Sequence, residues 1–180
     1  MAFDERSELA EHAIDLLLEA ARWAPSAGNS QPWAFLPARR GTDLHELVVR
    51  RLTPSSARWA PEAACLVVNV GHRFIEDTDW AYSEFSDYDL GQAVAHMTLQ
   101  AEAMGLACRQ FRAFDLEGLT ADLGVAPGWE LVSITAVGKS AQDSDGHRER
   151  RSLSDLRSAA FSDGSAADAA IRARMPRVGR

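Results

Sequence analysis

The chain has 180 residues, 46% of them apolar and 25% charged, and a formal net charge of −7 at pH 7. These proportions indicate one globular domain with a substantial core, and the acidic charge argues against a nucleic-acid partner, because phosphate binding needs a surplus of Lys and Arg. Two cysteines without CxxC spacing predict no metal site, and the lack of a signal peptide or of an apolar run of about 20 residues predicts a cytoplasmic protein with no membrane partner.

The first part of the chain predicts two helices and two strands. Apolar residues recur at helical spacing over residues 4–23, and Pro25 ends that helix. A short apolar run at 33–36, bounded by prolines, is compatible with an edge strand. A second helix is expected at 42–52 with a threonine cap at its start. The β-prone run at 65–70 is typical of a strand buried on both faces.

The second part of the chain continues this alternation. The aromatic-rich segment 72–86 is long for a loop, and it predicts either short helical turns or a mobile flap. A long helix follows, with Asp87 as its cap and its end near Met104. A strand at 109–114, a helix capped by Asp115 that ends at Leu123, and a strand at 130–137 complete the expected elements.

Helices and strands therefore interleave around one core, which predicts an α+β fold with a layered α/β/α arrangement. We expect a single domain over residues 1–162. Residues 163–180 are polar and rich in Ala and Ser, and this composition favours a flexible C-terminal tail. A helical turn or two at 166–174 is the alternative within that tail.

The loop at 24–33 is dense in small polar groups. Its hydroxyl and amide groups belong to Ser26, Asn29, Ser30 and Gln31. Gly28 lets a ligand approach the backbone closely. Such donors and acceptors match a planar heterocycle that carries alternating carbonyl groups and ring nitrogens. On composition alone, however, a helix-ending turn beside a buried Trp is the favoured alternative.

The segment 20–33, Ala-Ala-Arg-Trp-Ala-Pro-Ser-Ala-Gly-Asn-Ser-Gln-Pro-Trp, resembles the flavin loop of the nitroreductase family, Ala-Pro-Ser-x-x-Asn-x-Gln-Pro-Trp. Shorter similarities follow in the family's order at 89–93, 104–106, 111–115, 123–127, 130–138 and 150–153. The resemblance spans about residues 8–157 and implies the nitroreductase-like fold, a central and mainly antiparallel sheet flanked by helices.

This resemblance implies an FMN-dependent oxidoreductase that is a homodimer with the flavin at its interface. NAD(P)H would pass hydride through flavin N5 to a nitroaromatic, a quinone or a similar small-molecule acceptor in a ping-pong cycle. The cofactor carries the chemistry, so no catalytic side chain is expected. Two alternatives keep the fold: a flavin-dependent dehydrogenase in a tailoring pathway, and a non-catalytic family member with weakened FMN binding.

Carried over residue by residue, the resemblance implies three groups of cofactor-binding residues. The residues expected on the isoalloxazine ring and the ribityl chain, partly across the dimer interface, are Pro25, Ser26, Asn29 and Gln31. The backbone near Arg112 and Ala113 is expected at flavin N5, where a hydrogen-bond donor is usual. The guanidinium groups expected on the FMN phosphate, which such groups bind as bidentate forks, belong to Arg148, Arg150 and Arg151.

The sequence departs from the family at two places. Family members carry an Arg-x-Ser-x-Arg segment before the first helix that supplies much of the phosphate site, whereas this sequence has only Arg6 there. The C-terminal arginines then hold the phosphate alone, or Arg39, Arg40 or Arg58 contributes, or FMN binds weakly. Arg112 stands where the family often has Gly. Its side chain is expected either in solvent or at the flavin pyrimidine, where its charge would favour the anionic reduced ring.

Overall fold

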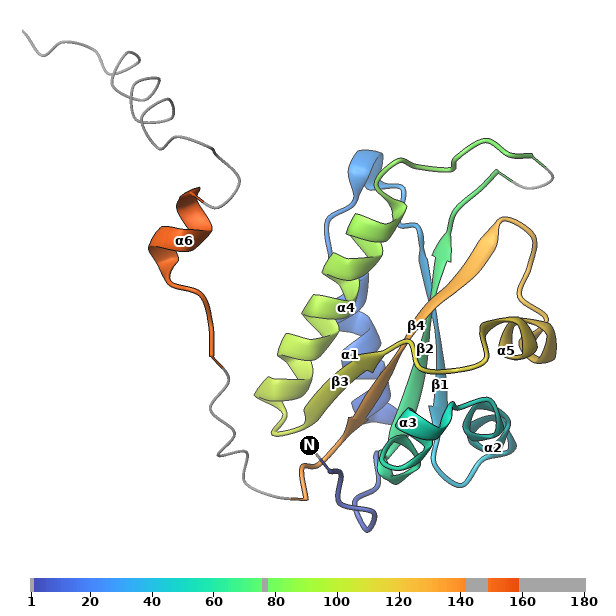
Figure 1. Cartoon of the computed structure of the whole chain (residues 1–180), viewed down its shortest axis with the longest axis vertical. Helices are drawn as coiled ribbons and strands as arrows, with labels where there is room; N and C mark the ends of the chain where they lie inside the picture. The colour runs from blue at the N-terminus through green and yellow to red at the C-terminus, as the bar shows by residue number, and fades with distance from the viewer. Residues whose placement is uncertain (1, 76–77, 142–148, 159–180) are drawn as a thin grey trace, which may run out of the picture. The chain divides into compact units, whose positions relative to one another are not determined.

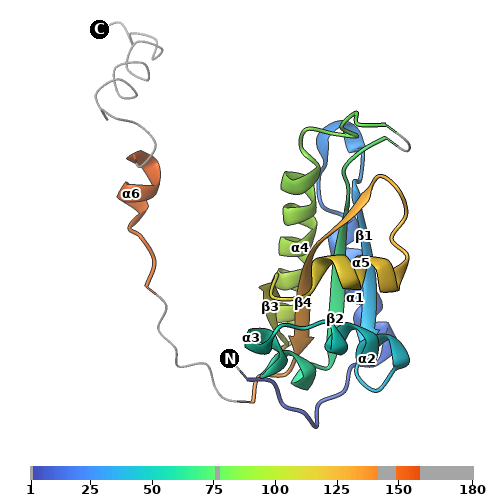
Figure 2. The ribbon, with the colours of Figure 1, turned by 45° about the vertical axis from the view of Figure 1, so that its right-hand side comes forward.

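The structure, a computed structural model, describes residues 2–75, 78–141 and 149–158. Contacts divide the chain into two compact units, Met1–Ser144 and Asp145–Arg180. The first unit combines one antiparallel sheet with helices on both of its faces (Figure 1, Figure 2), which confirms the predicted α+β fold. The predicted tail over 163–180 lies outside the described residues, and the domain boundary before it stays a prediction.

The sheet of the first unit has four strands in the order β1-β2-β4-β3, and each neighbouring pair is antiparallel. The strands are β1 (Trp33–Arg39), β2 (Cys65–His72), β3 (Ala107–Phe111) and β4 (Trp129–Gly138). Strand β1 runs three residues past its expected end and contains Pro37, which an edge strand tolerates because one row of its N–H groups has no ladder partner. Strand β3 ends at Phe111 instead of 114 because the chain then turns sharply.

Helices occupy the connections between these strands. Those described in the first unit are α1 (Glu11–Arg22), α2 (Asp43–Arg50), α3 (Pro54–Ala57), α4 (Ser86–Ala103) and α5 (Leu116–Leu123), with 3₁₀ turns η1 (Ala27–Asn29) and η2 (Ala60–Glu62). Two predicted caps are confirmed, because the Thr42 side chain accepts a hydrogen bond from His45 N–H and Asp115 accepts one from Gly118 N–H.

Two other helix starts differ from the prediction. Helix α1 begins at Glu11 rather than near residue 4, because the chain before it lies against the end of β4 and the Asp4 N–H donates to the Lys139 carbonyl. Helix α4 begins at Ser86 without a side-chain cap. The predicted cap at Asp87 is therefore wrong, because the helix starts one residue earlier, in a turn that Ser83 closes by accepting from the Phe85 and Ser86 N–H groups.

The sheet separates two apolar cores. Helices α1 and α4 pack on one face, where Leu17, Val67 and Met97 are fully buried. Helices α2 and α5 cover the other face, where Ile134 and Leu119 are fully buried. Strand β2 is buried on both faces, as its unbroken apolar sequence predicts.

The second unit contains helix α6 (Leu153–Ser158). It begins with a reciprocal cap, because the Ser152 Oγ accepts from Asp155 N–H while Ser152 N–H donates to the Asp155 carboxylate. Among the described residues of both units, no helix combines the length and apolar character needed to cross a bilayer.

Candidate functional site

The loop between α1 and β1 has a strained backbone. Gly28, Asn29 and Gln31 have φ angles of 58°, 56° and 48°. Asparagine tolerates this left-handed region, but a glutamine there is uncommon and costs about 1–3 kcal/mol unless its surroundings hold it. Such strain is concentrated at ligand sites and persists only where neighbouring groups hold the backbone.

Helix α4 anchors the loop from below, where Figure 1 shows the blue turn beside the first turn of the helix. The Asp89 carboxylate, only 2% exposed, accepts a hydrogen bond of 2.9 Å from the Ala27 N–H. The Gln92 side chain donates to the same carboxylate at 3.3 Å and to the Pro25 carbonyl at 3.4 Å. The sequence analysis gives neither Asp89 nor Gln92 a role. The signal that could have found Asp89 is that the first turn of the helix contains two acidic residues, Asp87 and Asp89, of which only one can be the cap.

Two further hydrogen bonds complete the support of the loop. The Ser26 Oγ accepts from the Gln31 N–H at 3.0 Å, which closes the turn on itself. The Tyr82 hydroxyl donates to the Ser30 carbonyl at 3.0 Å from the segment that precedes α4. The backbone of the loop is thus held from three sides while most of its side chains remain available.

The segment before α4 is tied to the sheet by a stack of three rings. The His72 imidazole lies between Tyr82, with ring centroids 3.8 Å apart, and Trp129, with centroids 4.5 Å apart. An isolated bridge pairs Phe74 with Ala81. The described part of 72–86 contains a ring-stacked strap and, before Ser86, none of the short helical turns predicted as one alternative; the mobile flap stays a prediction, and residues 76–77 lie outside the described part.

The predicted contact residues of the loop form one open cluster. Pro25, Asn29 and Gln31 are exposed and line a hollow of about 360 Å³ together with the end of α1, and Ser26 is half-buried beside them. Among the described residues, nothing hydrogen-bonds the Asn29 side chain. The buried Ser30 Oγ likewise has no partner there. Because buried polar atoms are nearly always satisfied in native proteins, this corner has the properties of a site for a polar ligand.

Arg112 and Ala113 follow β3, at the opposite edge of the sheet from the loop. The two edge strands are three inter-strand spacings apart, about 14 Å, so a single chain does not bring the loop and Ala113 together. The exposed Arg112 guanidinium donates to the Val132 carbonyl of β4 at 2.8 Å, which fixes the direction of its side chain. The assignment of both residues to a flavin stays a prediction.

The Ala113 carbonyl is held by α3 and the residue before it. It accepts hydrogen bonds from the Thr53 N–H and from the Thr53 hydroxyl, each at 3.1 Å, and a short one from the Ser56 hydroxyl. Ser56 is 1% exposed. Neither residue stood out in the sequence, because a Thr-Pro-Ser-Ser run reads as an ordinary helix start.

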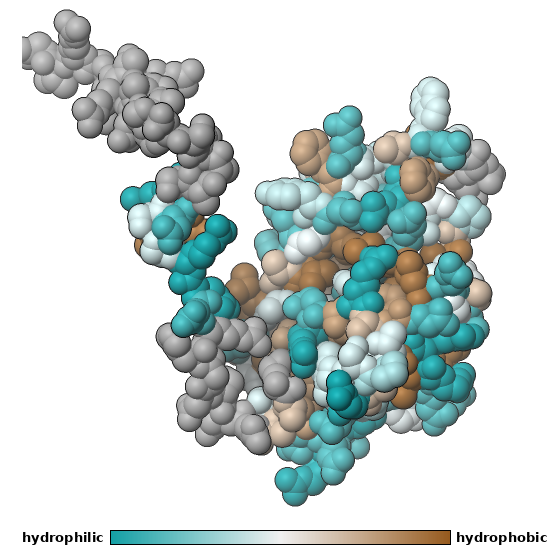
Figure 3. Space-filling model, in the orientation of Figure 1, coloured by the Kyte–Doolittle hydropathy of each residue, from teal (hydrophilic) through white to brown (hydrophobic). Residues whose placement is uncertain are grey.

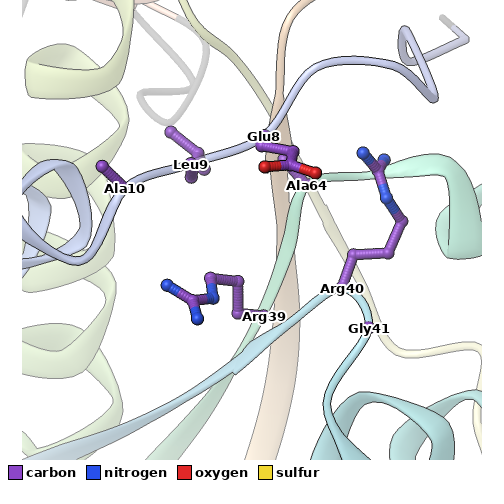
Figure 4. A pocket seen from close by; sticks show the side chains of 7 residues that line it. All are labelled: Glu8, Leu9, Ala10, Arg39, Arg40, Gly41 and Ala64. Atoms are coloured by element: carbon purple, nitrogen blue, oxygen red, sulfur yellow. The ribbon is translucent and has the colours of Figure 1, made fainter.

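The predicted phosphate-binding arginines are only partly described. Arg148 lies outside the described residues, while Arg150 and Arg151 are exposed in the second unit, so their contact with a phosphate stays a prediction. Arg39 and Arg40 line a different hollow of about 580 Å³ at the far end of β1, where Figure 4 shows their side chains pointing in different directions.

The far end of β1 does not serve the loop. Arg40 donates to the carbonyls of Glu62 and Ser7 at 2.6 and 2.5 Å, so its guanidinium holds the main chain. Six residue steps of strand separate it from the loop by about 20 Å, which the short ribityl arm of FMN does not span. Arg58 is different: it is exposed and follows Ser56 by two residues, beside the α3 contact to Ala113.

Thiol and metal chemistry find no support in the described residues. Burial raises the pKa of Cys65 to about 12 and that of Cys108 to about 11, so both thiols stay protonated and unreactive at neutral pH. No group of three or more His, Cys, Asp or Glu side chains in the described ranges is placed to hold a metal ion.

Comparison with known proteins agrees with this geometry. Residues 2–64, which include the whole loop, match the model of the Nitroreductase family. A 5,6-dimethylbenzimidazole synthase of Rhodospirillum rubrum is 28% identical over 153 residues, with 71% of each chain covered.

Two solved structures share the fold. One, an oxidoreductase containing FMN, has a TM-score of 0.77 at 24% identity and covers 86% of this chain and 83% of its own. The other, a nitroreductase of Desulfovibrio desulfuricans in complex with FMN, has a TM-score of 0.72 at 25% identity and covers 87% and 88%. The sequence of the loop resembles the nitroreductase family, whose model matches residues 2–64, and the fold is that of the two FMN-containing structures.

Proposed function

We propose that this protein is a homodimeric FMN-dependent oxidoreductase that carries hydride from NAD(P)H to a nitroaromatic, a quinone or a similar flat acceptor. The observation that carries the proposal is the loop at 24–33, whose strained backbone is held by α4 and by Tyr82, while the Ser30 hydroxyl is buried without a partner among the described residues. FMN supplies the hydride chemistry when bound, in a ping-pong exchange between donor and acceptor.

The loop residues fit the edge of a flavin. Asn29 and Gln31 carry amides that both donate and accept, as the alternating carbonyls and nitrogens of a flavin edge require. The buried Ser30 hydroxyl has no hydrogen-bond partner among the described residues. The chain's part in the reaction is to bind the ring, to fix its tilt and to leave one face open to the substrate.

A second copy of the chain would complete the site. The loop lies at one edge of the sheet and Ala113 at the other, so a flavin touching both groups has to lie between two chains. The outer face of α4 is suited to such pairing. Tyr88, Ala95 and Leu99 are exposed on it at intervals of seven and four residues, the spacing of one helical stripe.

Two hollows lie along this stripe, next to exposed apolar side chains. Trp23 and Leu99 are 73% and 69% exposed, and both line a hollow of about 390 Å³. A second hollow of about 490 Å³ lies between α4 and Gln110 of β3. Figure 3 shows apolar side chains gathered in the hollowed middle of the face that presents α4. Exposed apolar patches of this kind mark protein interfaces, and a twofold-related copy would bury both sides of α4.

The test is reconstitution followed by anaerobic stopped-flow reduction. The full chain is mixed with FMN, desalted and examined by absorbance, and we expect a yellow protein with one FMN per chain. NADPH or NADH should then bleach the flavin, and a quinone or a nitroaromatic should restore its colour. A colourless protein refutes the proposal and supports a non-catalytic member of the family. Retained FMN that neither nicotinamide reduces supports the dehydrogenase alternative.

A further inference from the structure

We propose that Thr53 and Ser56 are positioning residues: they hold the Ala113–Phe114 peptide, which in turn bonds the Arg112 carbonyl, so that the free Ala113 N–H of the Arg112–Ala113 peptide meets flavin N5. The inference rests on the proposed function, because it needs FMN at the Ala113 turn. It assigns a role to two hydroxyl groups that both donate to the Ala113 carbonyl. The contacts around Ala113 carry the argument.

Three donors converge on one carbonyl oxygen. The Thr53 N–H, the Thr53 hydroxyl and the Ser56 hydroxyl all donate to the Ala113 carbonyl. A carbonyl oxygen has two lone pairs, so a third donor exceeds what satisfying the group requires. Ser56 is almost fully buried and is fixed in turn by the Thr53 carbonyl at 3.2 Å. The Ala113–Phe114 peptide, to which this oxygen belongs, is therefore held in one orientation.

The turn itself is also fixed on its other side. The Phe114 N–H donates to the Arg112 carbonyl at 3.0 Å, which closes a γ-turn centred on Ala113. The Arg112 side chain holds β4 through the Val132 carbonyl. Every acceptor of this turn is used, whereas the Ala113 N–H donates to no acceptor in the described residues.

A fixed, unused donor at this place has a chemical consequence. N5 of an oxidised flavin has an in-plane lone pair that accepts a hydrogen bond, whereas N5 of the reduced flavin carries a hydrogen of its own. A donor that cannot turn away therefore favours the oxidised ring over the reduced one. Loosening the turn at Ala113 should shift the equilibrium between oxidised and reduced flavin toward the reduced form. The Ala113 N–H itself stays in place in such a variant.

The test compares the double variant Thr53→Val/Ser56→Ala with the control Ser55→Ala. Ser55 lies in the same helical turn and bonds only the Thr53 hydroxyl, not the Ala113 carbonyl. Two quantities are measured for each FMN-loaded protein: the FMN dissociation constant, and the ratio of oxidised to reduced flavin in equilibrium with a redox dye. We expect the dissociation constant of oxidised FMN to rise about fivefold and the ratio to fall by the same factor in the double variant, which is the effect of one hydrogen bond to the oxidised ring, while the control leaves both unchanged.

Further variants separate positioning from simple destabilisation. Thr53→Ser keeps the hydroxyl and should retain the wild-type ratio, and Ser56→Ala alone should give part of the shift if the double variant does not fold. An unchanged ratio in variants that bind FMN normally overturns the positioning role alone. A wild-type protein that binds no FMN overturns the proposed function and this inference with it.

Discussion

Asp89 offers the sharpest test of the site, because it is almost fully buried and acts on the loop only through the Ala27 N–H and Gln92. In Asp89→Ala the Ala27 N–H loses a charged acceptor at 2.9 Å and Gln92 loses a weaker contact at 3.3 Å. A hydrogen bond to a charged group contributes about 1.5–3 kcal/mol. The loop needs that support, since the left-handed Gln31 alone costs about 1–3 kcal/mol.

The expected effect on FMN binding follows from this energy. Without this hydrogen bond the loop leaves its binding conformation more often, and FMN binding has to supply the lost free energy. The FMN dissociation constant should then rise roughly tenfold to a hundredfold, because each 1.4 kcal/mol is a factor of ten. Asp87→Ala is the matched control: it removes the same charge from the same helical turn, but Asp87 is exposed and lies away from Ala27. Fluorescence quenching of FMN gives both dissociation constants, and thermal unfolding shows that each variant is folded. Equal dissociation constants for Asp89→Ala and wild type would refute the reasoning.

Three other changes test separate parts of the proposal. Asn29→Gly keeps the left-handed backbone and removes the unpartnered amide, so FMN binding should weaken about fivefold; an unchanged affinity in a flavin titration would take this side chain out of the site. Replacing Arg148, Arg150 and Arg151 together by Ala should weaken FMN by roughly tenfold or more but leave riboflavin unaffected, and equal losses for both ligands would contradict a phosphate role. Leu99→Asp should give a monomer in sedimentation equilibrium that also retains less FMN; a stable dimer would exclude the outer face of α4 as the interface.

Local chemistry made much of this fold predictable. Thr42 and Asp115 satisfy free N–H groups of their own helices, so a few residues of sequence suffice to locate them. The loop could be recognised because its residues match the flavin-loop motif of the nitroreductase family without a gap, whereas its composition alone favours an ordinary turn. Strand β2 could be recognised because a strand buried on both faces reads as a continuous apolar run.

The parts that escaped prediction depend on distant residues. Asp89 meets the loop 62 positions away in the chain, and Ser56 meets Ala113 across 57. No local pattern encodes such pairs, and an acidic residue near a helix start is first interpreted as a cap, as happened with Asp87. The late start of α1 also depends on a distant residue, because the Asp4 N–H bonds the Lys139 carbonyl next to β4 and this part of the chain does not join the helix.

The Tyr82 side chain couples the ring-stacked strap to the loop that is proposed to bind FMN. Its ring leans on His72 while its hydroxyl grips the Ser30 carbonyl, so one residue belongs to both the strap and the loop. Exchanging the strap for a relative's should therefore loosen the loop, and with it the proposed FMN site, unless a tyrosine is kept at this position.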